Sequence, residues 1–368
     1  MTKTLYIPFI VGLLAFAAYG QKISKPTQIP KPATADQSTM ITQGIAFHDA
    51  KKYDEAAAKY EAVLVQNPDC TQAIYELSMT LYAKGDKEKA METANRGSKY
   101  ISDELPLFYG VMASVLDDMG KPAEALKIYQ DGIKLLEGND RFGNYRSTIY
   151  YNMGVTYLKQ NKYNEARTAF KSAVENNFGY ASPNYFLAEV FFATKYKIPA
   201  LLAASRFITL DFTSQRSKRA AAIINQIANA PAQQGTDGKI TINLDISAPT
   251  DEGEFGPIEL ILAANDQITE KEGDDAKKNL TAEERFADRI DTVISLLDVN
   301  DKKNSKTFVA INYFPFLQEM KAKGYVKPFA YVVSYVSGSA NAEEWVNANG
   351  ARVREMLAWA KAYQRPAK

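Results

Sequence analysis

Apolar and small residues recur through the middle of the chain at a period that predicts paired helices. Five alanines spaced by 34, 35, 41 and 34 residues align as one position: Ala56, Ala90, Ala125, Ala166 and Ala200. Twelve residues before each of them stands another small residue: Gly44, Ser78, Ala113, Gly154 and Ala188. Apolar residues lie around these marks at helical spacing, as at Ile74, Leu77 and Leu81. Because antiparallel helices approach closely only where side chains are short, the pattern predicts a stack of helical hairpins.

Two short motifs give this repeat a family resemblance. Lys-Tyr-Asp-Glu-Ala ends at Ala56, and Asn-Lys-Tyr-Asn-Glu-Ala ends at Ala166. An aromatic residue follows the marked alanine by four positions in three copies, at Tyr60, Tyr129 and Phe170, on the same helix face. With these features, residues 37–212 resemble five tetratricopeptide repeats. The resemblance implies a right-handed helical solenoid, and we expect residues 213–230 to form its capping helix.

The same resemblance implies a binding surface. In this family the first helix of each repeat lines the concave surface, and the matching positions here are mainly aromatic or apolar. Those expected to bind a partner are Tyr75, Met79, Tyr82, Tyr151, Leu158, Tyr185 and Phe192. Cations are few, and the set of lysines, asparagines and an arginine with which some members hold a terminal carboxylate is missing. The surface therefore favours an extended peptide or an amphipathic helix. In the alternative interpretation, part of this row packs against the C-terminal third of the chain as ordinary interior.

The N-terminal residues predict export. Lys3 precedes an apolar run, Leu5–Ala18, and small residues stand at minus three and minus one before Gln21. This pattern is typical of a secretory signal peptide over residues 1–20, similar to those of Bacteroidetes-type bacteria. The run is shorter than the roughly 20 residues that span a bilayer, so no stable membrane insertion is expected after signal removal. No cysteine follows for lipid attachment, which predicts a periplasmic or secreted protein. Residues 21–36, with three prolines, are expected to be a flexible linker.

Composition and missing motifs argue against an enzyme. The 368-residue chain carries 44 basic and 43 acidic residues, so its charge does not indicate nucleic acid binding. One cysteine and one histidine exclude a disulfide framework and a Cys/His zinc site. Neither a phosphate-binding Gly-rich loop nor a Gly-x-Ser-x-Gly motif occurs. His48 and Cys70 are expected to be structural, and Asp298–Asp301 lacks the glycine and glutamate of a calcium loop. Adjacent carboxylates such as Asp117 and Asp118 diverge on a helix. We therefore expect no catalytic residue, cofactor or metal.

The C-terminal third predicts a smaller α-rich module with one or a few strands, over residues 231–368. Lys239–Ser247 alternates strictly and predicts a strand. Its partner could be 307–312 or 330–336, and either could equally be a buried helix. Helices are expected at 257–265, at 282–297 behind a capping box, and from Asn341 towards Tyr363. The module is similar to the uncharacterised tail that follows such repeats in some exported bacterial proteins, which implies a compact, mostly helical unit.

Three functions are compatible with these observations. The favoured one is an exported, non-enzymatic scaffold or assembly factor that binds a polypeptide through the concave surface. A second is a hydrolase or other enzyme with its site in the C-terminal module, using carboxylates and Tyr313 or Tyr325. A third is carbohydrate binding through exposed aromatic side chains.

Overall fold

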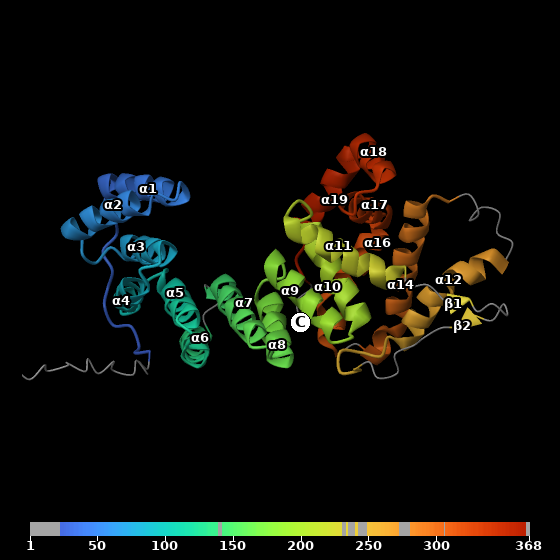
Figure 1. Cartoon of the computed structure of the whole chain (residues 1–368), viewed down its shortest axis with the longest axis horizontal. Helices are drawn as coiled ribbons and strands as arrows, with labels where there is room; N and C mark the ends of the chain where they lie inside the picture. Colours follow the sequence, from blue (N-terminus) through green and yellow to red (C-terminus); the bar gives the residue numbers. More distant parts are fainter. Residues whose placement is uncertain are drawn as a thin grey trace, which may run out of the picture.

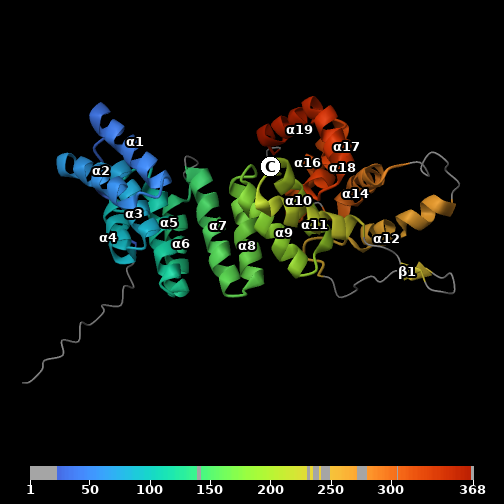
Figure 2. The same ribbon diagram turned by 45° about the horizontal axis from the view of Figure 1, so that its top comes forward.

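The protein is a row of helical hairpins joined to a cluster of shorter helices. The computed structural model describes residues 23–138, 142–229, 233–234, 240–241, 249–271, 280–304 and 306–365. The expected signal peptide lies outside the described residues. The hairpins lie side by side along the long axis, and the C-terminal helices gather at the far end of the row (Figures 1 and 2). The helices of the row are α1 Ala35–Asp49, α2 Tyr53–Gln66, α3 Thr71–Lys84, α4 Lys87–Gly97, α5 Leu105–Asp118, α6 Pro122–Leu136, α7 Gly143–Lys159, α8 Tyr163–Asn176, α9 Ala181–Ala193 and α10 Lys197–Leu210.

The hairpins form where the spacing of small residues predicts them. Gly44 lies in α1 against the ring of Tyr60 in α2, and Gly154 lies in α7 against the ring of Phe170 in α8. A Cβ atom added at either glycine would stand 2.5 Å from the nearest ring carbon. The small position is therefore required by the aromatic residue four places after the marked alanine. The two features predicted for the repeat, a small residue on the first helix and an aromatic residue on the second, are therefore in direct contact.

The turns inside the five hairpins have the same backbone conformation at one position. The residue five places before the marked alanine has a positive φ in every copy, with values of 59° at Lys51, 97° at Gly85, 75° at Gly120, 57° at Asn161 and 68° at Lys195. Only glycine adopts this left-handed region without steric cost. The first and fifth copies place a lysine there, so the hairpin packing outweighs the local cost.

Residues within the expected N-terminal linker follow a fixed course along the first repeats. The backbone N–H groups of Thr27 and Gln28 donate to the carbonyl of Lys99 at 3.0 Å, and Lys31 N–H donates to the carbonyl of Asp69 at 3.0 Å. The Asn67 side chain donates to the carbonyls of Lys31 and Pro32. Proline favours extended backbone whose carbonyls stay free to accept hydrogen bonds. The segment is therefore anchored to the loops that precede α3 and α5.

The C-terminal third is helical in the part of the chain that the structure describes. Its helices are α11 Gln215–Ala228, α12 Gly256–Lys271, α14 Ala282–Asn304, α15 Phe308–Asn312, α16 Phe314–Ala322, α17 Val326–Val336, α18 Ala340–Ala348 and α19 Gly350–Ala362. The capping box behind α14 is present, with Thr281 and Glu284 each bonded to the other's backbone N–H.

The expectation of a module with β-structure is not supported. In the described part of residues 231–368, strand pairing is limited to two-residue segments, β1 Gln233–Gln234 and β2 Ile240–Thr241, which are antiparallel. The rest of the alternating stretch lies outside the described residues. Both candidate partners are helical, as α15 and α17. Residues Phe329–Val333 are all buried, because helices surround α17, and this packing overrides the β-propensity of its residues.

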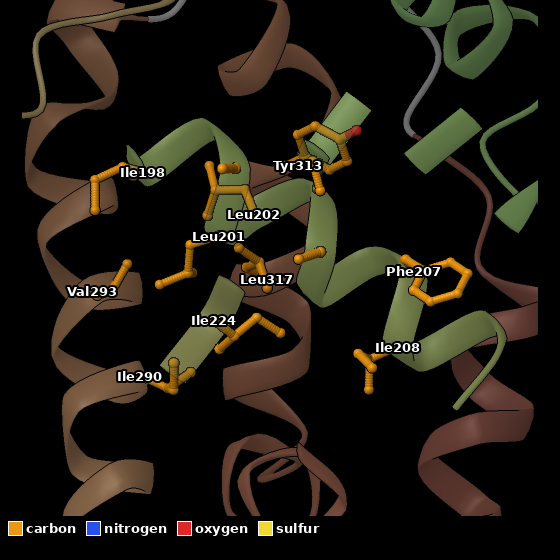
Figure 3. Close-up of a cluster of buried hydrophobic side chains, with 14 of the residues drawn as sticks. Ile198, Leu201, Leu202, Phe207, Ile208, Ile224, Ile290, Val293, Tyr313 and Leu317 are labelled. Atoms are coloured by element: carbon orange, nitrogen blue, oxygen red, sulfur yellow. The ribbon is translucent and has the colours of Figure 1, made fainter. Parts of the chain in front are cut away.

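The last repeat and the C-terminal helices share one hydrophobic core. Residues 198–209 of α10 are all buried. Figure 3 shows Leu201 and Leu202 of α10 beside Ile224 of α11, Val293 of α14 and Leu317 of α16. The expected capping helix is present as α11, but it packs between α10 and the C-terminal helices. The C-terminal third thus continues the core of the last repeats, while repeats one to three and Ile149 of α7 form a second apolar cluster.

Candidate functional site

The seven residues expected to bind a partner lie on the first helices of the second, fourth and fifth hairpins. We call this row the A-helix face; its members are Tyr75, Met79 and Tyr82 on α3, Tyr151 and Leu158 on α7, and Tyr185 and Phe192 on α9. All seven are half-buried, so each keeps part of its surface open to solvent. The repeat register therefore brings together residues that stand up to 117 positions apart in the sequence.

The N-terminal end of the A-helix face is aromatic and acidic. Tyr75 meets the ring of Phe108 edge-on, with centroids 6.1 Å apart. Burial, with a smaller effect of the Glu76 carboxylate, raises the pKa of Tyr75 to about 12. The pKa of Glu76 itself is raised, first by burial and then by the negative charge of Asp49. At this end of the face, the negative charge of Asp49 therefore adds to burial in disfavouring the ionised form of Glu76.

The centre of the face is held by a polar link across three first helices. Tyr82 on α3 donates its hydroxyl proton to Asp118 on α5 at 2.6 Å. Lys159 on α7 donates to Asp117 at 2.6 Å and to Asp118 at 3.4 Å. The hydrogen bond from Tyr82, with a smaller effect of Lys159, lowers the pKa of Asp118. The two carboxylates, which were expected to diverge, thus converge on one ammonium group and fix α3, α5 and α7 relative to each other.

The C-terminal end of the face is aromatic and basic. The Tyr151 ring lies 5.4 Å from that of Tyr180 and 5.8 Å from that of Phe186. Arg216 of α11 stacks over Tyr185 at 5.5 Å and over Phe186 at 5.3 Å, and donates to the Ser182 hydroxyl. Cation–π contact of this kind holds a guanidinium in place without neutralising its charge.

Arg219 of α11 reaches the same face one turn further on. It donates two hydrogen bonds to the carboxylate of Glu189, at 2.9 and 3.1 Å, and stacks over Phe192 at 5.6 Å. Arg216 and Arg219 were not among the side chains that the sequence placed at the candidate site. Their spacing of three residues could have indicated that both lie on the same side of α11.

The described residues that follow α11 contact the repeats elsewhere. Lys171 on α8 pairs with Glu252 at 2.5 Å, and Lys197 at the start of α10 pairs with Glu259 at 2.9 Å. Near the chain end, Arg365 donates to the backbone carbonyl of Glu175 at the end of α8. For the described residues, the hydrogen bonds, ion pairs and ring contacts of the A-helix face come from the repeats and α11.

The side chains considered for catalysis serve packing. Tyr313 is fully buried and donates its hydroxyl proton to the Asn184 side chain at 2.9 Å. The buried Tyr325 donates to Glu355 at 3.0 Å. Burial raises the pKa of the Cys70 thiol, which disfavours the reactive thiolate. Over the described ranges, no group of three or more His, Cys, Asp or Glu side chains is placed to hold a metal ion. The side chains of 298–301 lie outside the described residues.

Two other surfaces were compared with the A-helix face. An open hollow of about 550 Å³ lies between α2, α3 and α4, and its lining is charged. Lys84 in this hollow pairs with Asp54 at 2.5 Å and Asp86 at 3.8 Å. The hollow therefore mixes acidic and basic side chains and is not aromatic or apolar like the A-helix face. Exposed aromatic side chains among the described residues include Tyr163 on α8 and Tyr335 on α17, which belong to different parts of the fold. Neither surface is a row of aromatic and apolar side chains that extends over several repeats, as the A-helix face does.

Family models support the assignment of the repeat. Two models of the tetratricopeptide repeat match residues 47–115 and 105–177. No curated protein matches the chain. The structure is similar to that from the functional characterisation of pilF of Pseudomonas aeruginosa, with 15% identity, coverage of 52% of this chain and 83% of that one, and a TM-score of 0.44.

Two further solved structures match about half of this chain. A thermophilic tetratricopeptide-repeat protein of Thermus thermophilus is 17% identical, covers 51% of this chain and 98% of its own, and has a TM-score of 0.42. YrrB, described as a repeat protein with an unusual peptide-binding site, is 16% identical, covers 50% and 90%, and has a TM-score of 0.34.

Within the described residues, no helix is both long and apolar enough to cross a membrane. Tetratricopeptide-repeat proteins generally mediate protein–protein interactions and are typically non-enzymatic. The middle of this chain is a run of tetratricopeptide repeats.

Proposed function

We propose that the protein is a non-enzymatic scaffold or assembly factor that binds an extended polypeptide segment along the A-helix face. The observation that carries this proposal is the row of seven half-buried aromatic and apolar side chains on α3, α7 and α9. Rigid aromatic side chains give a large contact area at a small cost in conformational entropy. The polar link through Lys159 and Asp118 favours a preformed face, which lowers the cost of ordering it on binding.

Peptide selection tests this proposal directly. A phage library of random twelve-residue peptides is selected on the immobilised full chain, and the enriched peptides are titrated by fluorescence anisotropy. We expect Tyr75→Asp and Met79→Lys to weaken binding by about tenfold or more, since each removes apolar contact area. The matched control is Tyr163→Asp, which changes an exposed tyrosine on the second helix α8.

Thermal unfolding of the same variants separates binding from folding. Lysine can extend its charged end to water from a half-buried site, so Met79→Lys is expected to stay folded. Lost binding at an unchanged melting temperature supports the proposal. Unchanged binding in both folded variants contradicts it, and so does loss of folding in both, because the row would then be interior.

We also propose that the chain is exported to the periplasm or the medium. The support is the apolar run Leu5–Ala18, followed by small residues before Gln21. Mass spectrometry of the protein from fractionated cells is expected to find a mature chain that begins at Gln21, outside the cytosol. A chain that keeps Met1 and stays in the cytosol would contradict export.

A further inference from the structure

Charged side chains near the A-helix face are separated by sign. At the N-terminal end, Asp49 is exposed at the end of α1 and Glu76 is half-buried on α3. Among the described residues, neither carboxylate has a hydrogen bond or an ion pair with a cation. At the C-terminal end, Arg216 has the Ser182 hydroxyl as its polar partner and two rings beneath it. The face therefore has an acidic end and a basic end.

The charges between these ends are compensated within the protein. Lys159 pairs with Asp117 and Asp118, and Lys87, which donates to the Asp118 backbone carbonyl, supplies a second positive charge beside them. Arg219 pairs with Glu189. A bound segment would meet a nearly neutral, aromatic centre. The groups left to attract a partner's charge are those at the two ends.

Glu76 at the acidic end and Arg216 at the basic end would each gain from an opposite charge on a partner. Burial and the charge of Asp49 raise the pKa of Glu76, so its ionised form is disfavoured in the folded protein. A carboxyl group with a raised pKa stabilises the fold only below that pKa, and this contribution is lost as the pH rises through it. Glu76 is thus a cost to folding at neutral pH, which a partner's cation would relieve. Arg216 is already oriented by its rings and keeps guanidinium N–H groups for a carboxylate.

We infer that the A-helix face selects an extended segment with a basic side chain at the α1–α3 end, an acidic side chain at the α11 end, and apolar or aromatic side chains between. This inference rests on the proposed function and adds the chemistry of the partner. From α3 to α11 there are four steps between neighbouring first helices, each about 8–10 Å, or roughly 35 Å. An extended chain rises about 3.3 Å per residue, so the two charges stand about ten residues apart.

Charge exchange between protein and peptide tests the inference. Enriched peptides from the twelve-residue library are expected to carry a basic and an acidic residue near opposite ends. Arg216→Glu is expected to weaken binding of such a peptide about tenfold, and changing the peptide's acidic residue to lysine is expected to restore binding to this variant. The matched control is Lys218→Glu. It makes the same charge change at an exposed position of α11, and residues two apart on a helix face different directions.

The acidic end is tested with Glu76→Gln. We expect this variant to weaken the same peptides several-fold while its melting temperature stays equal to or above that of the wild type, because a disfavoured charge is removed. The control is Glu88→Gln at an exposed position of α4.

The outcomes distinguish this inference from the proposed function. The inference would be overturned, and the proposed function kept, if the selected peptides lose affinity for Tyr75→Asp and Met79→Lys but carry no basic and acidic residue at opposite ends. Equal affinity for the wild type, Arg216→Glu and Glu76→Gln would also overturn it. A selection that yields no peptide dependent on Tyr75 or Met79 contradicts the proposed function, and the inference fails with it.

Discussion

Replacing Arg206 by alanine is expected to destabilise the last repeat together with the C-terminal helices by about 3–5 kcal/mol. The Arg206 side chain on α10 has no exposed surface. Its guanidinium lies between the rings of Phe178, at 4.3 Å, and Phe316, at 4.5 Å. It donates to the backbone carbonyls of Ala360 at 2.7 Å and Phe178 at 3.3 Å. Alanine would leave a cavity between two rings and remove the donor of two buried carbonyls.

A methionine at the same position is the informative control. Arg206→Met keeps most of the volume and removes a buried cation, whose pKa burial lowers to about 9. We therefore expect a smaller loss of stability than with alanine, since both variants remove the charge but methionine fills most of the space that alanine would leave empty. Urea unfolding followed by circular dichroism measures both variants. A loss below about 1 kcal/mol for Arg206→Ala would show that α10 and α19 are not joined through this side chain.

Changing Gly154 to alanine is expected to destabilise the protein by about 1–3 kcal/mol, although alanine favours helices by about 1 kcal/mol over glycine. The added Cβ would stand 2.5 Å from the Phe170 ring, closer than side-chain packing allows. Gly110 on α5 is the matched control, because no atom lies within 4 Å of a Cβ added there. Gly110→Ala is expected to keep or increase stability.

The opposite signs of the two glycine variants test the steric basis of the repeat. Thermal and urea unfolding of both variants give the comparison. A second change, Phe170→Leu, is expected to recover part of the loss caused by Gly154→Ala, since the two positions are in contact. Equal effects at Gly154 and Gly110, or no recovery with Phe170→Leu, would contradict close packing of the glycine on the ring.

The hairpins could be predicted from sequence because the signal that defines them is local. Gly154 and Phe170 are sixteen residues apart, and their spacing recurs from copy to copy. The shared core of the last repeat and the C-terminal helices has no such signal. The hydrogen bond from Arg206 to Ala360 joins residues 154 positions apart, and no repeat connects them. The strand expected at 239–247 had a clear alternation, but alternation does not identify a partner strand.

The sequence predicted which helices carry the A-helix face, but it did not predict the charged side chains that contact this face. The repeat register placed Tyr75, Tyr151 and Tyr185 on first helices, as the structure has them. The contacts of Arg216 depend on how α11 packs beside α9, and those of Lys159 depend on the offset between α5 and α7. Such offsets are set by the stacking of whole hairpins, which the sequence of one hairpin does not specify.

Hydrogen–deuterium exchange of the full chain, with and without a saturating selected peptide, tests the central claim most directly. If an extended segment binds the A-helix face, amide exchange slows in α3, α7 and α9, and the second helices α2, α4 and α6 stay unchanged. Protection confined to those second helices or to α14–α19 would place the bound segment elsewhere and contradict the claim.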